Sequence, residues 1–270
     1  MITELTDRFL ALHTPGRPLL MPNPWDRGAA KLLESLGFEA LATTSSGFAA
    51  TLGRLDGMVS REEAIAHAAE IVDAVDVPVS ADLENCFADD PGGVAETVRL
   101  AVEAGLAGCS VEDFSGLESE PIYEAGLAAE RVAAAAEAAH SGARRLVLTA
   151  RAENHVHGID DLADTIARLQ GFQEAGADVL FAPGLRELDQ IRELVSSVDL
   201  PVNVLALPGV PPVSELAEAG VSRISVGGGI AFAAYGAAAT AGRELLESGT
   251  YDYWKTAGPG AKAVREAFDS

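Results

Sequence analysis

Cysteine, basic residues and long apolar runs are all scarce in this chain, and each shortage excludes a class of protein. The 270 residues include two cysteines, Cys86 and Cys109, which form no C-x-x-C pair and no even framework, so both read as reduced thiols. Lys and Arg number 19 against 41 Asp and Glu, a net charge of −22. We therefore expect no nucleic-acid partner, because phosphate contacts need a basic face.

The apolar residues are spread along the chain, and no uninterrupted run approaches membrane-spanning length. Residues 1–5 show no basic region followed by an apolar stretch, so we expect no signal peptide, no membrane partner and a cytoplasmic location. Hydrophobic residues make up 48% of the chain and charged residues 22%, which suits one large globular domain. We expect residues 1–270 to form this single domain, with residues 247–270 as a C-terminal helical tail.

One short pattern recurs: a helical stretch ends in glycine and is followed at once by an apolar run. The four glycines are Gly37, Gly105, Gly176 and Gly220. Glycine ends a helix because it enters the left-handed conformation cheaply, and an apolar run is typical of a strand covered on both faces. With the strands that lack this signal, the chain reads as eight strands, each followed by a helix. This alternation predicts a closed (β/α)8 TIM-type barrel, with an open doubly wound sheet as the alternative.

The expected elements can be placed by residue number. The strands are 19–21, 40–44, 77–82, 108–112, 146–151, 178–181, 201–205 and 222–226. The clearest helical patterns are 61–75, 94–104, 127–140, 161–175, 188–198 and 231–246. Ser60 and Glu63 have the spacing of a capping box at the start of the first of these. In a barrel, active residues lie where the strands end, and polar residues gather after strands two to five.

The stretch 77–90 gives the strongest single indication of a site. It begins as an apolar strand and passes directly into acids, with Asp82 and Glu84 where the strand ends. A carboxylate is costly to bury unless a positive group meets it, and a hard divalent cation suits two acids at this spacing. The alternative is a solvated acidic loop.

Five segments, in order, resemble the isocitrate lyase and phosphoenolpyruvate mutase superfamily. They are Thr43-Thr44-Ser45-Ser46-Gly47, Gly53-Arg54-Leu55-Asp56-Gly57, Ser80-Ala81-Asp82-Leu83-Glu84, Val111-Glu112-Asp113 and Thr149-Ala150-Arg151-Ala152-Glu153. The resemblance runs over nearly the whole chain. It implies a Mg²⁺-dependent enzyme that acts on small 2-oxo or 2-hydroxy carboxylates.

The resemblance also implies roles for particular residues. The metal site is expected at Asp82, Glu84 and Glu112, and the catalytic residues are expected to be Arg151, Asp56 and Glu112. A loop at Ser45, Ser46 and Gly47 is expected to hold the substrate carboxylate. Further substrate contacts are expected from Asp82, Arg151, Asn203 and Trp25, although Trp25 can equally cap the barrel.

The reaction itself stays open at this point, because residues 114–123 contain no Cys, His or Lys. In the family's lyases the matching segment is a lid that carries a cysteine. In the family's phosphonate enzymes this lid carries Lys and Asn. We expect a carbon–carbon lyase that works through an enolate. The alternatives are a phosphorus–carbon mutase or hydrolase, an oxaloacetate hydrolase, or a non-catalytic 2-oxo acid binder.

Other residues have a structural interpretation beside a functional one. Cys86 is expected to be a buried filler and Cys109 a core residue. His155 and His157 are expected to be hydrogen-bonded loop residues, with proton donation as the alternative. Residues 227–229 are expected to serve close packing rather than a phosphate site. Aromatic residues in the C-terminal tail, together with the family's exchange of a C-terminal helix between subunits, predict a homo-oligomer, a dimer or a tetramer.

Overall fold

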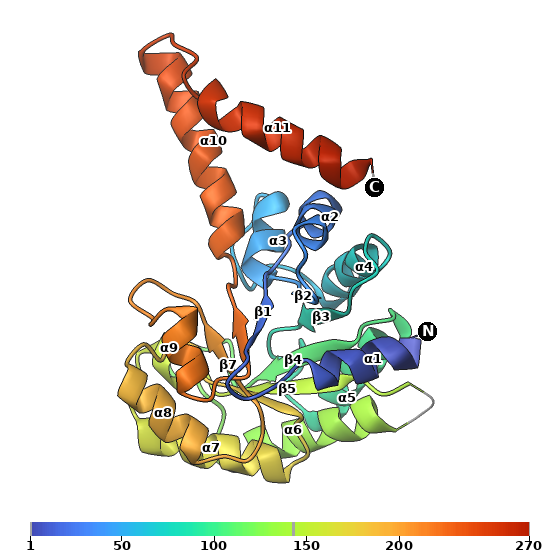
Figure 1. Ribbon diagram of the computed structural model, residues 1–270. Coiled ribbons are helices and arrows are strands. Elements are labelled where there is room, and N and C mark those ends of the chain that lie inside the picture. Colours follow the sequence, from blue (N-terminus) through green and yellow to red (C-terminus); the bar gives the residue numbers. More distant parts are fainter. Residues whose placement is uncertain (1, 142–143, 270) are drawn as a thin grey trace.

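The computed structural model describes residues 2–141 and 144–269, and its centre is one sheet of eight parallel strands (Figure 1). The strands are β1 (Leu19–Met21), β2 (Leu41–Ala42), β3 (Val79–Asp82), β4 (Gly108–Glu112), β5 (Val147–Arg151), β6 (Val179–Phe181), β7 (Val202–Leu205) and β8 (Arg223–Ser225). Their order is β1-β8-β7-β6-β5-β4-β3-β2. The predicted barrel is confirmed, and the doubly wound alternative is wrong.

The barrel closes between its first two strands through single bonds rather than a ladder. The amide of Ala42 donates to the carbonyl of Pro22 at 3.1 Å. The side chain of Asn23 donates to the carbonyl of Thr43 at 2.9 Å. Because both bonds lie at the carboxyl ends of the strands, this is also where the rim of the barrel is drawn together.

The helices alternate with the strands, and several of them begin at a side-chain cap. They are α1 (Ile2–Ala11), α2 (Arg27–Ser35), α3 (Ser45–Thr51), α4 (Arg61–Val72), α5 (Pro91–Glu103), α6 (Ala125–His140), η1 (Asn154–His157), α7 (Leu162–Glu174), α8 (Leu188–Ser196), α9 (Val213–Glu218), α10 (Gly229–Glu247) and α11 (Trp254–Phe268). The predicted capping box is confirmed: Glu63 N donates to Ser60 Oγ, and Ser60 N donates to the Glu63 carboxylate. None of the described helices is long and apolar enough to cross a membrane.

The interior of the barrel changes character along its axis. At the amino ends of the strands, Phe9 from α1 packs into a buried apolar cluster with Leu19, Val147 and Val179. Farther along the axis the buried residues are polar, and they include Ser80, Ser110, Thr149, Asn203 and Arg223. Branched apolar residues commonly fill this part of a TIM barrel. Here polar residues take their place and line a cavity that opens toward the carboxyl ends of the strands.

The C-terminal helices depart from the expected arrangement. Residues 231–246 were expected to be a barrel helix, but Figure 1 shows α10 running away from the barrel, with Ala231 its buried residue. Helix α11 folds back toward α2, where Phe268 approaches Gly28. The projecting part therefore begins with α10 at Gly229 rather than at residue 247.

Candidate active site

Asp82, Glu112 and Arg151 are the last residues of the adjacent strands β3, β4 and β5. Arg151 forms ion pairs with the other two. Arg151 Nη1 lies 2.8 Å from Asp82 Oδ1, and its Nη2 lies 3.0 Å from Glu112 Oε2. A third ion pair joins Arg151 Nε to Glu153 Oε1 at 2.9 Å. Glu112 and Arg151 are direct partners in the parallel ladder between β4 and β5, which explains why the side chains meet. The structure therefore brings Asp82, Glu112 and Arg151 together at the rim.

The charges in this cluster do not balance. Burial lowers the pKa of Arg151, but Glu153, Glu112 and Asp82 together raise it well above its usual value. Burial raises the pKa of Glu112 well above its usual value, although Arg151 opposes the shift. One guanidinium thus faces three carboxyl groups, so the rim holds more acidic groups than basic ones.

A second group of acids adds to this excess. Burial, followed by the charges of Asp82 and Asp56, raises the pKa of Glu84 to about 7. Burial also raises the pKa of Asp56; a hydrogen bond from Ser45 opposes the shift, and the charge of Asp82 adds to it. Carboxyl groups whose pKa is raised by neighbouring carboxylates in a partly buried site are an arrangement that a cation would stabilise.

The backbone that carries Glu84 is held in an uncommon conformation. Glu84, Cys86 and Phe87 have φ values of 51°, 60° and 56°, in the left-handed region that side chains disfavour. The buried Arg131 clamps this segment by donating to the carbonyls of Asn85, Ala88 and Asp89. Helix α6, which carries Arg131, therefore helps to fix the loop on which Glu84 lies.

The fit of this site to Mg²⁺ can be judged from its donors. Among the described residues, no three His, Cys, Asp or Glu side chains form a group that could hold a metal ion by themselves. The Glu112 carboxylate faces Arg151 instead. Mg²⁺ commonly keeps several waters and uses only one or two carboxylates, so Asp82 and Glu84, with Asp56 nearby, fit a hydrated ion. The metal roles of all three expected residues remain predictions.

The expected carboxylate-binding loop is the first turn of helix α3. Thr44 caps this helix by accepting a hydrogen bond from Gly47 N at 3.3 Å. Ser45 donates to Asp82 Oδ2 from its amide at 3.3 Å and from its hydroxyl at 3.1 Å. A side chain on Gly47 would place Cβ 2.6 Å from Thr44 Cγ2, so this glycine permits close packing.

A cavity of about 200 Å³ joins the rim to the middle of the barrel. Six expected residues line it: Ser45, Ser46, Asp56, Asp82, Arg151 and Asn203. Four expected residues do not belong to its lining: Trp25, Gly47, Glu84 and Glu112. Glu84 instead shares a much smaller neighbouring cavity with Asp82 and His67. The cavity therefore contains most of the expected substrate contacts but not the whole acidic cluster.

Trp25 packs against helix α3. Its Cβ would be 3.1 Å from a Cβ on Gly47, and its carbonyl lies 3.0 Å from His67 Nε2. The described structure thus gives Trp25 a packing position, and its predicted contact with substrate remains untested.

The cysteines, the histidines and the last glycines take the structural positions expected of them. Both thiols are free and buried, and burial raises the pKa of Cys86 to about 12, so it is a poor proton donor. His155 contacts Asp160 and Thr165, and His157 stacks on Phe114. A Cβ on Gly228 would lie 2.7 Å from Ser46 Oγ, which is close packing beside the cavity.

Sequence reasoning missed Arg223. This residue begins β8, is 3% exposed and lines the inner part of the cavity. Its guanidinium donates to Asn203 Oδ1 at 2.9 Å, to Thr149 Oγ1 at 3.0 Å and to His13 Nε2 at 3.2 Å. A signal was present, because an arginine within a strand that is expected to be buried on both faces is unusual.

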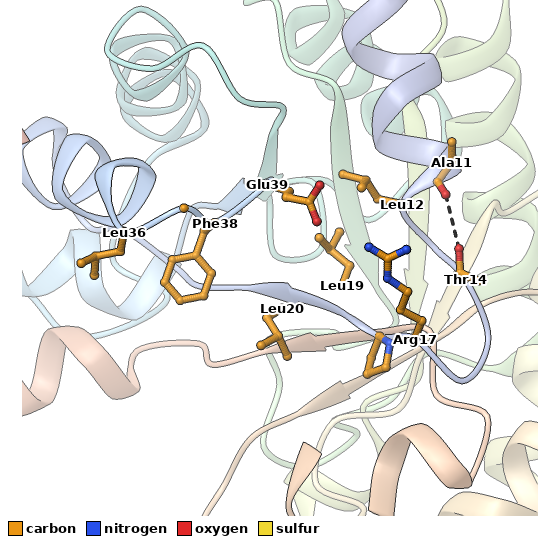
Figure 2. A pocket seen from close by; sticks show the side chains of 11 residues that line it. Ala11, Leu12, Thr14, Arg17, Leu19, Leu20, Leu36, Phe38 and Glu39 are labelled. Atoms are coloured by element: carbon orange, nitrogen blue, oxygen red, sulfur yellow. Dashed lines mark hydrogen bonds between the residues drawn. The ribbon is translucent and has the colours of Figure 1, made fainter. Parts of the chain in front are cut away.

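A larger cavity, about 390 Å³, lies at the opposite end of the barrel. Figure 2 shows side chains that line it, from the end of α1 through the start of β1 and from the segment that precedes β2. Its charged members are Arg17 and Glu39, beside Leu12, Leu20 and Phe38. Size alone would favour this cavity. The smaller one is the candidate active site, because it joins Asp82 to Arg151 at the carboxyl ends of the strands.

A (β/α)8 barrel with acids and an arginine converging at the carboxyl ends of its strands has the architecture of a barrel enzyme. Residues 9–246 match the family model of phosphoenolpyruvate phosphomutase. The chain belongs to this family, and with it to the superfamily of phosphoenolpyruvate mutase and isocitrate lyase enzymes.

Similar proteins include both lyases and phosphonate enzymes. A provisionally assigned lyase/mutase from Burkholderia cenocepacia J2315 is 47% identical, covers 100% of this chain and 98% of its own, and has a TM-score of 0.96. A 2-methylisocitrate lyase from Bacillus subtilis (strain 168) is 29% identical over 74% of this chain and 66% of its own length. A phosphonopyruvate hydrolase solved with oxalate and Mg²⁺ shares the fold at 22% identity and a TM-score of 0.84, over 98% of this chain and 94% of its own.

Proposed function

We propose that this protein is a Mg²⁺-dependent lyase that forms or breaks a carbon–carbon bond beside the carboxylate of a small 2-oxo or 2-hydroxy acid. The observation that carries the proposal is the convergence of Asp82, Glu112 and Glu153 on Arg151 beside the serines of α3. The resemblance to a 2-methylisocitrate lyase supports the carbon–carbon bond.

The metal would be held by Asp82 and Glu84, with Asp56 and Glu112 nearby and water completing the coordination. When bound, Mg²⁺ supplies a fixed positive charge near the oxygens on which negative charge develops. The phosphonopyruvate hydrolase of the same fold, solved with Mg²⁺ and oxalate, supports this assignment.

Arg151 is the protein's own electrostatic device in this mechanism. Three carboxylates fix its guanidinium, so little reorganisation is needed when an oxyanion forms beside it. Its Nη atoms each keep an N–H beyond the ion pairs, because a guanidinium has five donors and three are engaged. Arg151 would direct these donors at the enolate oxygens left by bond cleavage.

Ser45 and Ser46 would hold the substrate carboxylate, since both line the cavity next to Arg151. Asp56 lines the same cavity and would remove the hydroxyl proton of a 2-hydroxy acid. Residues 114–123 contain no Cys, His or Lys that could return a proton to the enolate. The hydroxyl of Tyr123, in the same segment, already donates to Asp89 Oδ1 at 2.5 Å.

Phosphorus–carbon chemistry is the second candidate, because the matching family model is that of a phosphomutase. An enolate would be stabilised by the same residues in either reaction. The test is a turnover screen of 2-hydroxy acids, oxaloacetate and phosphonopyruvate with Mg²⁺, in which pyruvate, glyoxylate, oxalate and phosphate are measured. Release of a 2-oxo acid from a 2-hydroxy acid is the expected result. Phosphate release alone would favour the second candidate, and binding of an acid without any product would leave a non-catalytic binder.

We also propose that a second copy of the chain covers the C-terminal hairpin, α10 and α11, as a dimer or tetramer. Phe232, Tyr235 and Leu246 are 52%, 43% and 88% exposed on α10. Apolar surface of this kind is costly in water and is typical of an interface. Light scattering should give a mass of at least twice 27.9 kDa, and a monomer would contradict the proposal. The buried free thiols are compatible with the cytoplasmic location that we propose.

A further inference from the structure

The middle of the barrel holds a positive charge that no acid neutralises. Arg223 is buried, and none of the described Asp or Glu residues forms an ion pair with it. Its three hydrogen-bond partners, Asn203, Thr149 and His13, are neutral. His13 is neutral because burial, and next the charge of Arg223, lower its pKa to about 3.

This arrangement is unusual because of its energetic cost. Burial, and next the charge of Arg151, lower the pKa of Arg223 to about 9, so the side chain still carries its proton at neutral pH. A buried charge is costly unless it is paired, and buried arginines are normally found with carboxylates. Arg151 follows that rule with three of them. Arg223 departs from it in a protein whose net charge is −22.

Arg223 is also placed where a ligand can reach it. It lines the same cavity as Asp82, Arg151 and Ser45, and the lining also includes Ser80 and Ser110. Three of its five N–H groups are engaged, so two remain. The cavity of about 200 Å³ is smaller than the roughly 300–1,000 Å³ of drug-sized sites and suits a short acid. The cavity can therefore present the guanidinium of Arg223 to one anionic group of a small molecule and the serines of α3 to another.

We propose that Arg223 binds the second carboxylate of a dicarboxylate substrate, at a subsite in the middle of the barrel. This inference rests on the proposed function, in which the first carboxylate is held by Ser45 and Ser46 at the rim. Arg223 then determines specificity: acids with a carboxylate at both ends neutralise it, and acids with a single carboxylate leave it unpaired.

The test compares L-malate with L-lactate, since malate is lactate with one more carboxylate. Calorimetry at pH 7 with Mg²⁺ gives the dissociation constants of both acids for the full-length protein. Wild type is expected to bind malate about tenfold or more tightly than lactate, as one charge-assisted contact would provide. Equal binding of the two acids would overturn the inference and leave the proposed function standing. Binding of neither acid would contradict both.

A pair of variants at Thr149 separates charge from structure. Thr149 Oγ1 already contacts Arg223, so Thr149→Asp places a carboxylate on the guanidinium, and Thr149→Asn is its neutral match. Thr149→Asp is expected to lose the preference for malate, whereas Thr149→Asn keeps it. An unchanged preference in Thr149→Asp would overturn the inference.

A third variant, Arg223→Gln, removes the charge itself and is expected to bind the two acids equally. Circular dichroism checks that each variant folds. If Arg223 only braces the barrel, folded Arg223→Gln will keep the wild-type ratio of malate to lactate binding, and the inference fails.

Discussion

The two ends of this barrel are built on opposite principles. At the amino ends of the strands, Phe9, Leu19 and Val147 form an apolar plug that is almost fully buried. At the carboxyl ends, one guanidinium meets three carboxylates, and Glu84 sits in a left-handed backbone conformation. The first arrangement lowers the free energy of the fold. The second raises it locally, and such local cost is characteristic of a functional site.

The difference teaches where changes should affect stability and where they should affect chemistry. Substitutions in the plug should unfold the protein without altering the reaction of the molecules that stay folded. Substitutions at the rim should alter binding or rate more than stability. Four substitutions, taken in order of decreasing effect, test that division.

Phe9→Ala should have the largest effect on stability. It empties the centre of the plug, and loss of a buried phenylalanine typically costs about 3–5 kcal/mol. Urea unfolding followed by circular dichroism measures the loss. Substrate affinity of the folded fraction at low temperature should match wild type, and a large change in affinity would contradict the division between the two ends.

Arg151→Lys should have the largest effect on the rate. Lysine keeps one charge but cannot form three ion pairs in a fixed plane, so donors aimed at the developing oxyanion are lost. The rate should fall about a hundredfold or more. Steady-state kinetics give kcat and KM. A variant with wild-type kcat would remove Arg151 from the mechanism.

His13→Gln should change how the stability of the protein depends on pH. The unfolded chain takes up a proton on His13 below pH 6.5, whereas the folded protein does so only near pH 3, because burial lowers the pKa. Wild type should therefore lose stability as pH falls through this window, by about 1.4 kcal/mol per pH unit from this group. Unfolding free energies at pH 6.5 and 5.0 test this, and equal pH dependence in variant and wild type would refute it.

Ser60→Ala should have the smallest effect. The serine caps α4 at the rim but lies outside the cavity lining, so its loss should cost about 1 kcal/mol of stability. Thermal unfolding measures the cost. Kinetic constants should stay at wild-type values, so a changed KM would extend the functional rim as far as α4.

Most of the strands and of the candidate site residues could be predicted from short sequence patterns. Asp82, Glu112 and Arg151 were placed correctly, because strand ends can be recognised from the apolar runs that precede them. Ser45 and Ser46 were expected in a loop, because a Ser-Ser-Gly run hides the short helix that Thr44 caps. The projection of α10 was missed, since an apolar helix does not reveal what covers it. Likewise, nothing in the neighbourhood of Arg223 in the chain indicates the distant partners it meets in the barrel.

The most direct measurement is calorimetric binding of pyruvate, with and without Mg²⁺, to wild type, to Asp82→Ala and to Asp76→Ala. Asp76 is an exposed acid just before β3 and serves as the matched control. We expect Mg²⁺-dependent binding in wild type and Asp76→Ala and its loss in a folded Asp82→Ala. Unchanged Mg²⁺ affinity and pyruvate binding in Asp82→Ala would contradict this expectation.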